Sequence, residues 1–215
     1  QICMNGFAAL ELQLFIAQVL GISPADIPIV DDQQALTDKN ILYLGMPPED
    51  TPLKRLRRKV SRRWNDVDHY AEEHFHIDVL TRRDVVQVVL TGETPRALLY
   101  SAYEFLEHLG IHWIAAGAQN TFGPRMDTLR MKTGHKEFTP DFLARGLWLD
   151  RDAEAPLTTR WLNWAARNRI NTFRVPDTLL PEIKKRGFML NTGRTDVFTT
   201  LLKPEYTYRY NHPQS

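Results

Sequence analysis

The stretch Trp161-Leu-Asn-Trp-Ala-Ala-Arg-Asn-Arg-Ile-Asn-Thr-Phe173 decides the fold class, because a helical pattern in it runs directly into a strand pattern. We predict a helix over 156–169 and a strand over Asn171–Val175. The neighbouring predicted elements are a strand at Phe142–Leu149, a helix over 178–186 and a strand at Phe188–Asn191. This strict alternation requires right-handed crossovers and predicts a parallel sheet.

Three strands and two helices are too few to close a barrel, but they suit the opening of a (β/α)₈ barrel. The residues before them follow a different pattern. A helix over 7–20 stops at Gly21, and a second helix begins with Thr94 as its N-cap and Pro95 as its first residue. The predicted strands of this part are Asn40–Gly45, Ile77–Leu80, Val85–Leu90 and Ile111–Ile114.

Residues 117–141 are rich in glycine and proline and predict a loop and linker zone. The predicted fold class is therefore α/β. A small accessory α/β domain over 1–137 is followed by the first βαβαβ units of a (β/α)₈ barrel over 138–215. Both ends of the chain look cut, so we expect a fragment of a longer protein.

Composition excludes several classes of function. Of the 215 residues, 43% are hydrophobic and 25% are charged, as in globular proteins rather than disordered ones. The net charge of +1 provides no global basic field, so we expect no nucleic-acid partner. No apolar stretch approaches the roughly 18 residues of a transmembrane helix, so we expect no membrane partner. The single cysteine, Cys3, excludes an internal disulfide.

Metal and cofactor motifs are weak. His69, His74 and His76 lie close in sequence but do not form a metal-binding helix motif, so we predict no metal site. Lone glycines such as Gly45 and Gly92 do not make a phosphate-binding loop, and we expect no cofactor. The compartment stays open, with a periplasmic or secreted location as the expectation.

Several stretches, in order along the chain, resemble known glycoside hydrolases. Thr94-Pro-Arg-Ala-Leu-Leu-Tyr-Ser-Ala-Tyr-Glu-Phe-Leu-Glu-His-Leu-Gly-Ile-His-Trp113 resembles the second half of the non-catalytic N-terminal domain of β-hexosaminidases (family 20) and α-glucuronidases (family 67). Phe142-Leu-Ala-Arg-Gly-Leu-Trp-Leu-Asp150 resembles the first barrel strand of family 20, and 161–173 its first helix and second strand. Lys184-Lys-Arg-Gly-Phe-Met-Leu190 resembles the next helix-to-strand junction. The resemblance implies an α/β sandwich ahead of a TIM barrel.

The resemblance implies a parent enzyme that hydrolyses O-glycosyl bonds of a hexosaminide or uronide. Its partners are then the carbohydrate substrate and the remaining barrel strands. In family 20 the catalytic carboxylates follow the fourth barrel strand, which here would lie beyond Ser215, so we expect the chain alone to be inactive. Phe173-Arg-Val-Pro-Asp177 lacks the histidine usual in family 20, and the segment that begins at Gly193 looks closer to the α-glucuronidase group.

Five residues are candidates for substrate binding because working residues of such barrels sit at the carboxyl ends of strands. The resemblance implies that Arg145 hydrogen-bonds sugar hydroxyls, and its guanidinium suits a diol or a uronate. The alternative for Arg145 is an internal salt bridge. Asp150 either binds a sugar or caps a loop, and Asp177 either lies on the rim or caps a helix. Arg194 and Asp196 follow the third strand and are candidates for a sugar pocket.

A basic segment over 54–63 carries seven Lys and Arg residues. Leu53, Leu56, Val60 and Trp64 form an apolar stripe at helical spacing along it. The segment favours either a non-catalytic module that binds an acidic polysaccharide or another polyanion, or a plain solvated helix face. The sequence leaves both interpretations open.

Overall fold

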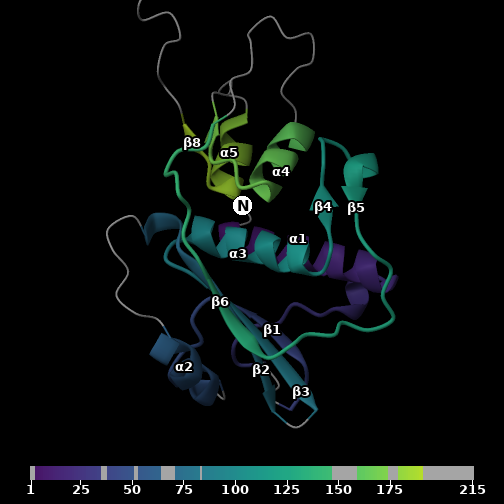
Figure 1. Ribbon diagram of the computed structural model, residues 1–215, viewed down its shortest axis with the longest axis vertical. Coiled ribbons are helices and arrows are strands. Elements are labelled where there is room, and N and C mark those ends of the chain that lie inside the picture. The colour runs from purple at the N-terminus through teal and green to yellow at the C-terminus, as the bar shows by residue number, and fades with distance from the viewer. Residues whose placement is uncertain are drawn as a thin grey trace, which may run out of the picture.

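The structure is a computed structural model that describes residues 3–34, 38–50, 53–63, 71–82, 84–146, 159–173 and 179–190. Its centre is a four-stranded mixed sheet (Figure 1). The strands lie in the order β1 (Ile41–Leu44), β3 (Val85–Gly92), β2 (Phe75–Arg82) and β6 (Gly134–Phe138). β1 and β3 are parallel, and the other neighbours are antiparallel. The mixed α/β class and the β2–β3 hairpin are as predicted.

Two long helices, α1 (Met4–Leu20) and α3 (Pro95–His108), cover one face of this sheet (Figure 1). The signals that define their ends in the sequence are present in the structure. Gly21 ends α1 with a φ of 64°, in the left-handed region that glycine adopts at low cost. The Thr94 hydroxyl accepts a hydrogen bond from the backbone N–H of Ala97 and caps α3.

The opposite face of the sheet is covered by α2 (Lys54–Val60), which continues into the 3₁₀ turn η2 (Ser61–Arg63). Leu56 and Val60 of α2 pack with Leu80 of β2 in a small second core, which also contains Leu53. Leu53, Leu56 and Val60 of the predicted apolar stripe are thus buried. Most of the basic residues between them are exposed. Trp64, the fourth residue of the stripe, lies outside the described residues.

The loop and linker predicted for 117–141 is wrong in part. It contains β5 (Thr121–Phe122), which pairs with β4 (His112–Trp113), and β6, which is the fourth strand of the main sheet. β6 is short, polar and at a sheet edge, so it shows none of the alternation of apolar residues that predicts a strand. The predicted domain boundary between 137 and 138 falls inside this strand.

The C-terminal part contains the predicted alternation of helices and strands. Its described elements are α4 (Thr159–Arg167), β7 (Thr172–Phe173), α5 (Leu180–Arg186) and β8 (Met189–Leu190). β7 and β8 are parallel, and Gly146 forms an isolated parallel bridge with Thr172. The sequence predicts this parallel direction of the strands. The described residues do not show a barrel.

The predicted strand at Phe142–Leu149 is wrong over its first four residues, which form a loop. The side chain of Asn171 takes up backbone groups that a neighbouring strand would otherwise pair. Its amide oxygen accepts from the Arg145 N–H at 2.7 Å, and its amide nitrogen donates to the Leu143 carbonyl at 2.7 Å. Phe142 is 72% exposed, which is inconsistent with a buried strand. Residues 147–149 lie outside the described residues.

The C-terminal elements pack on the side of α1 and α3 that faces away from the sheet (Figure 1). Leu162 of α4, Phe173 of β7 and Ile183 of α5 are buried in the same core as both helices. An ion pair between Arg167 and Glu11 joins α4 to α1 at 2.8 Å. Among the described helices, none combines the length and apolar composition that a membrane crossing needs.

Candidate functional site

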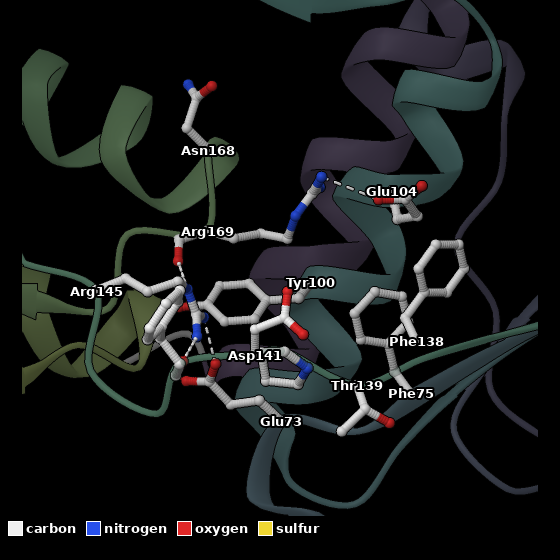
Figure 2. Close-up of a pocket in the computed structure, with 12 residues that line it drawn as sticks. Glu73, Phe75, Tyr100, Glu104, Phe138, Thr139, Asp141, Arg145, Asn168 and Arg169 are labelled. Carbon is white, nitrogen blue, oxygen red and sulfur yellow. Dashed lines mark hydrogen bonds and ion pairs between the residues drawn. The ribbon is translucent and has the colours of Figure 1, made fainter.

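A pocket of about 320 Å³ lies where the loop before Gly146 meets β2, β6 and α3 (Figure 2). Its charged lining residues are Glu73, Glu104, Asp141, Arg145 and Arg169. Its aromatic lining residues are Phe75, Tyr100, Phe138 and Phe142. Phe75 and Phe138 come from neighbouring strands, and their rings stack at 4.9 Å. The pocket therefore combines flat apolar surfaces with groups that donate and accept hydrogen bonds.

Arg145 is the predicted substrate-binding residue that the structure describes, and its side chain lines this pocket (Figure 2). Its Nε donates to the Arg169 carbonyl at 2.8 Å, and one terminal nitrogen donates to the Phe142 carbonyl at 2.5 Å. The other terminal nitrogen forms an ion pair with Glu73. This is the internal salt bridge that the sequence leaves as the alternative to sugar binding.

Glu73 holds the inner end of the pocket. It ends the 3₁₀ turn η3 (Ala71–Glu73), one residue before β2 begins, and its side chain is only 1% exposed. Besides Arg145, its carboxylate lies 2.7 Å from Arg96 Nε and accepts from Asn171 Nδ2 at 2.7 Å. Two cations and an amide offset the cost of burying this charge. With both oxygens engaged, Glu73 serves as an anchor of the site rather than as a general acid.

Arg169 connects the pocket to α3. Its backbone has a φ of 57°, in the left-handed region, which costs a residue with a side chain about 1 kcal/mol. One terminal nitrogen lies 3.0 Å from Glu104 and 2.7 Å from Glu107. Its carbonyl accepts the hydrogen bond from Arg145. These contacts hold the turn after α4 in place and offset its backbone strain.

Tyr100 lines the pocket from α3 and is 1% exposed. Burial, followed by the negative charge of Glu73, raises the pKa of the Tyr100 hydroxyl well above its ordinary value of 10.0. The phenol therefore stays protonated at neutral pH. The Arg145 guanidinium lies over the ring, 5.8 Å from its centroid, and this contact adds a cation–π attraction.

Such a lining suits the binding of a neutral polar molecule better than acid–base chemistry. Both arginines are already ion-paired with glutamates, so the two cations of the lining are compensated before a ligand binds. Hydroxyl groups can hydrogen-bond to the arginines and carboxylates, while an apolar ligand face packs on the aromatic rings. This is the arrangement that a sugar ring can use.

The remaining predicted substrate-binding residues are Asp150, Asp177, Arg194 and Asp196, and all of them lie outside the described residues. Sequence reasoning missed Glu73, Tyr100 and Arg169. Glu73 and Arg145 are 72 positions apart, so no local spacing relates them. The available signal was a pair of glutamates, Glu72 and Glu73, a few residues before the strand predicted at Ile77–Leu80, and it is a weak one.

A second polar cluster lies on β2 and β6, on the face of the sheet opposite Phe75 and Phe138, and we call it the histidine cluster. Its members are His74, His76, Asp78, His135 and Glu137. The sequence predicts no metal site because His69, His74 and His76 lack a metal-binding helix motif, and the pattern does not reveal that the strand β6 brings His135 and Glu137 to His76. Burial, followed by electrostatic interactions with His74 and His135, lowers the pKa of His76 to about 4, so its ring is neutral at pH 7.

Comparisons with known proteins give distant likenesses. No protein-family model matches the sequence, and no curated protein matches it. A solved structure of a GH138 enzyme targeting pectin rhamnogalacturonan II is similar at 16% identity with a TM-score of 0.46. The match covers 88% of this chain and 23% of that one. The structure of CpGH84D is similar at 12% identity with a TM-score of 0.47, over 95% of this chain and 36% of that one. This chain spans well under half the length of either.

Proposed function

We propose that the chain is the N-terminal part of a glycoside hydrolase, with an accessory α/β domain that runs to the end of β6 and the opening of a catalytic (β/α)₈ barrel in the residues that follow it. The observation that carries the proposal is the parallel arrangement of Gly146, β7 and β8. α4 lies between Gly146 and β7 in the chain, and α5 lies between β7 and β8. Parallel strands joined by helices are the repeating unit of such barrels.

The parallel direction also supports a common location for the predicted binding residues. Asp150 follows Gly146 along the chain, Asp177 follows Phe173, and Arg194 follows Leu190. Because the carboxyl ends of parallel strands meet at one edge, segments that follow them start from the same edge. We propose that Asp150, Asp177, Arg194 and Asp196 contribute to substrate binding at that edge.

Arg145 can hold its own loop and still donate hydrogen bonds to a sugar in this proposal. Each of its terminal nitrogens carries two N–H groups, and the contacts to Phe142 and Glu73 use one on each. The second N–H of each can donate to a hydroxyl in the pocket. We propose that Arg145 holds the loop before Gly146 in place and offers these donors to the sugar.

The proposed reaction is hydrolysis of an O-glycosyl bond in a hexosaminide or a uronide. Such hydrolysis needs two carboxyl groups on either side of the scissile bond, or one acid assisted by the substrate. In the proposal these groups belong to a part of the parent enzyme that follows Ser215. The 215-residue chain would then supply substrate contacts and support, and would be inactive alone.

The test compares the protein encoded by the whole reading frame that contains this chain with the 215-residue chain itself. Both are assayed on aryl N-acetylhexosaminides and aryl glucuronides. We expect turnover of at least one substrate by the longer protein and none by the 215-residue chain. The proposal is overturned if the longer protein hydrolyses neither class, or if both proteins hydrolyse the substrate equally well.

A second candidate is a polyanion-binding module. It is favoured by the exposure of Arg55, Arg58, Lys59 and Arg62 along α2 and η2, where the buried stripe leaves the basic residues in solvent. Binding through released counterions would weaken steeply with salt. Heparin affinity is therefore measured against salt concentration for the wild type and for Arg58→Gln with Arg62→Gln. A steep slope that the double variant flattens supports this candidate, and a flat slope in the wild type excludes it.

A further inference from the structure

The histidine cluster has a geometry that comes from strand register. In the antiparallel pair of β2 and β6, His76 lies opposite Glu137 and Asp78 lies opposite His135. Side chains two positions apart on one strand share a face, and directly opposed residues also share it. The register therefore brings two histidines and two carboxylates together on one face, although β2 and β6 are far apart in sequence.

The two imidazole nitrogens of this group are spaced like two ligands of one metal ion. A zinc ion holds histidine nitrogens at about 2.0–2.1 Å, which places two tetrahedral ligand nitrogens about 3.3 Å apart. His76 Nδ1 and His135 Nε2 are 3.4 Å apart. One ligand atom from each of His76, His135 and Glu137 lies within 4.8 Å of the others. Glu137 Oε1 lies 3.7 Å from His74 Nε2, so the half-exposed Glu137 side chain has to turn toward His76 and His135 to complete a three-ligand set.

The second nitrogen of His135 is oriented by a carboxylate. His135 Nδ1 lies 3.0 Å from Asp78 Oδ1, and the Asp78 side chain is 1% exposed. An ionised carboxylate accepts hydrogen bonds, so this contact favours a proton on Nδ1 of His135 and leaves the lone pair on Nε2. A histidine that donates to a carboxylate through one nitrogen and binds metal through the other is the usual arrangement in zinc sites.

The second ring nitrogen of His76, Nε2, also has a neighbouring side chain that can orient it. His76 Nε2 lies 2.9 Å from His74 Nε2, and His74 Nδ1 lies 2.7 Å from the Thr139 hydroxyl oxygen. If His76 donates from Nε2 to His74, its Nδ1 lone pair points toward His135. His74 then donates from Nδ1 to Thr139. In this arrangement the lone pairs of His76 Nδ1 and His135 Nε2 face one another, and the other ring nitrogens of the row are each within hydrogen-bond distance of a partner.

We propose that His76, His135 and Glu137 bind one divalent transition metal ion, with Zn²⁺ as the ion that best suits two imidazoles and a carboxylate. Asp78 and His74 orient the two histidine ligands. The fourth position of a tetrahedral site would be taken by water. The bound ion would tie β6, the edge strand, to β2.

The competing occupant of the space between the two rings is a proton. In that state Thr139 donates to His74, and His74 donates to His76. His76 then donates to His135, and His135 donates to Asp78, so each histidine ring in the row is neutral. The geometry permits both states. When metal binds, the proton on His76 moves from Nδ1 to Nε2 and the proton on His74 moves from Nε2 to Nδ1, so each ring keeps one proton. The experiment therefore has to measure the metal itself.

The 215-residue chain is prepared without a polyhistidine tag, treated with EDTA and dialysed. ZnCl₂ is then titrated in by calorimetry, and CoCl₂ by visible absorption. We expect one equivalent of Zn²⁺ to bind with a dissociation constant of micromolar or below. Bound Co²⁺ should give the visible bands of a four-coordinate ion. His135→Gln and Glu137→Gln should each bind at least tenfold more weakly, and Asp78→Asn about tenfold more weakly.

His112→Gln is the matched control, because His112 is an exposed histidine on β4, outside the cluster. It should bind Zn²⁺ as the wild type does. Circular dichroism of each metal-free variant shows whether it is folded. For the wild type alone, Zn²⁺ should shift the imidazole NMR signals of His76 and His135 but not that of His112. The proposal is overturned if the wild type binds no Zn²⁺ at 100 micromolar, or if those two signals do not move.

Discussion

Arg145 and Glu73 are 72 residues apart in sequence, and their ion pair joins the loop before Gly146 to the start of β2. Glu73 also compensates Arg96, so its removal would leave two partly buried cations short of a counter-charge. We predict that Glu73→Gln lowers the free energy of unfolding by about 2–3 kcal/mol, since breaking a buried ion pair from one side is costly.

Urea denaturation measures this loss, and Glu72→Gln is the control. Glu72 lies on the same 3₁₀ turn, but its side chain is 67% exposed and its ion pair with Arg96 is long, at 3.5 Å. A surface pair of this kind contributes little, so Glu72→Gln should change the free energy of unfolding by about 0.5 kcal/mol or less. Equal losses in the two variants would contradict the anchoring role of Glu73.

Glu11 and Arg167 connect α1 to α4 through a two-point contact. Arg167 donates to both carboxylate oxygens at 2.8 and 3.0 Å, and its guanidinium also lies over the Phe15 ring. We predict that Glu11→Gln and Arg167→Met are strongly non-additive, with a coupling energy of about 2 kcal/mol in a double-mutant cycle. The cycle is measured by urea denaturation of the four proteins. Additive losses would show that the pair contributes little to the packing of α4.

Gly92 ends β3 next to the start of α3. A Cβ at this position would lie 2.3 Å from the backbone nitrogen of Leu98 and 2.6 Å from the carbonyl carbon of Ala97. Neither atom can move without shifting the helix, so we predict that Gly92→Ala lowers the free energy of unfolding by about 2 kcal/mol or more. Gly134→Ala is the control, because its nearest neighbouring atom is 4.0 Å away. Similar thermal melting of both variants would contradict this packing.

Glu182 and Arg186 lie one turn apart on α5. The hydrogen bond from Arg186 lowers the pKa of the Glu182 carboxyl below its ordinary value of 4.5. A carboxyl whose pKa is lower in the folded state stabilises the fold above its unfolded pKa, and this contribution is lost as the pH falls through the folded pKa. We predict that Glu182→Gln costs about 1 kcal/mol at pH 7 and that the cost disappears in acid.

Denaturation of the wild type and Glu182→Gln at a series of pH values between 7 and 2 tests this sign. The exposed Glu93 offers a control variant, Glu93→Gln, whose difference from the wild type should stay small at every pH. A cost of Glu182→Gln that grows as the pH falls would mean that the ion pair with Arg186 does not stabilise α5.

The elements that local signals define were predicted well. Gly21 ends α1, Thr94 and Pro95 start α3, and the apolar strands β2 and β3 pair as a hairpin. Each of these signals acts within a few residues. β6 has no such signal, because it is a polar edge strand whose pairing depends on β2 rather than on its own sequence.

The candidate site could be predicted only in part for the same reason. Arg145 was singled out from a resemblance, but its partner Glu73 is distant in sequence and is brought to it by the packing of the C-terminal part. His74 and His76 are two residues apart and were noted, whereas His135 and Glu137 join them through the register of a strand that was missed. Contacts that depend on strand register and packing produce no short motif in the sequence.

The measurement that tests the central claim most directly is kcat/KM of the protein encoded by the whole reading frame, on its best aryl glycoside. Arg194→Ala and Asp196→Asn are compared with the wild type, and His112→Gln serves as the control. We predict that each of the first two variants loses at least tenfold in kcat/KM while the control is unchanged. Unchanged kcat/KM in both variants, or no glycoside hydrolysis by the wild type, would contradict the account.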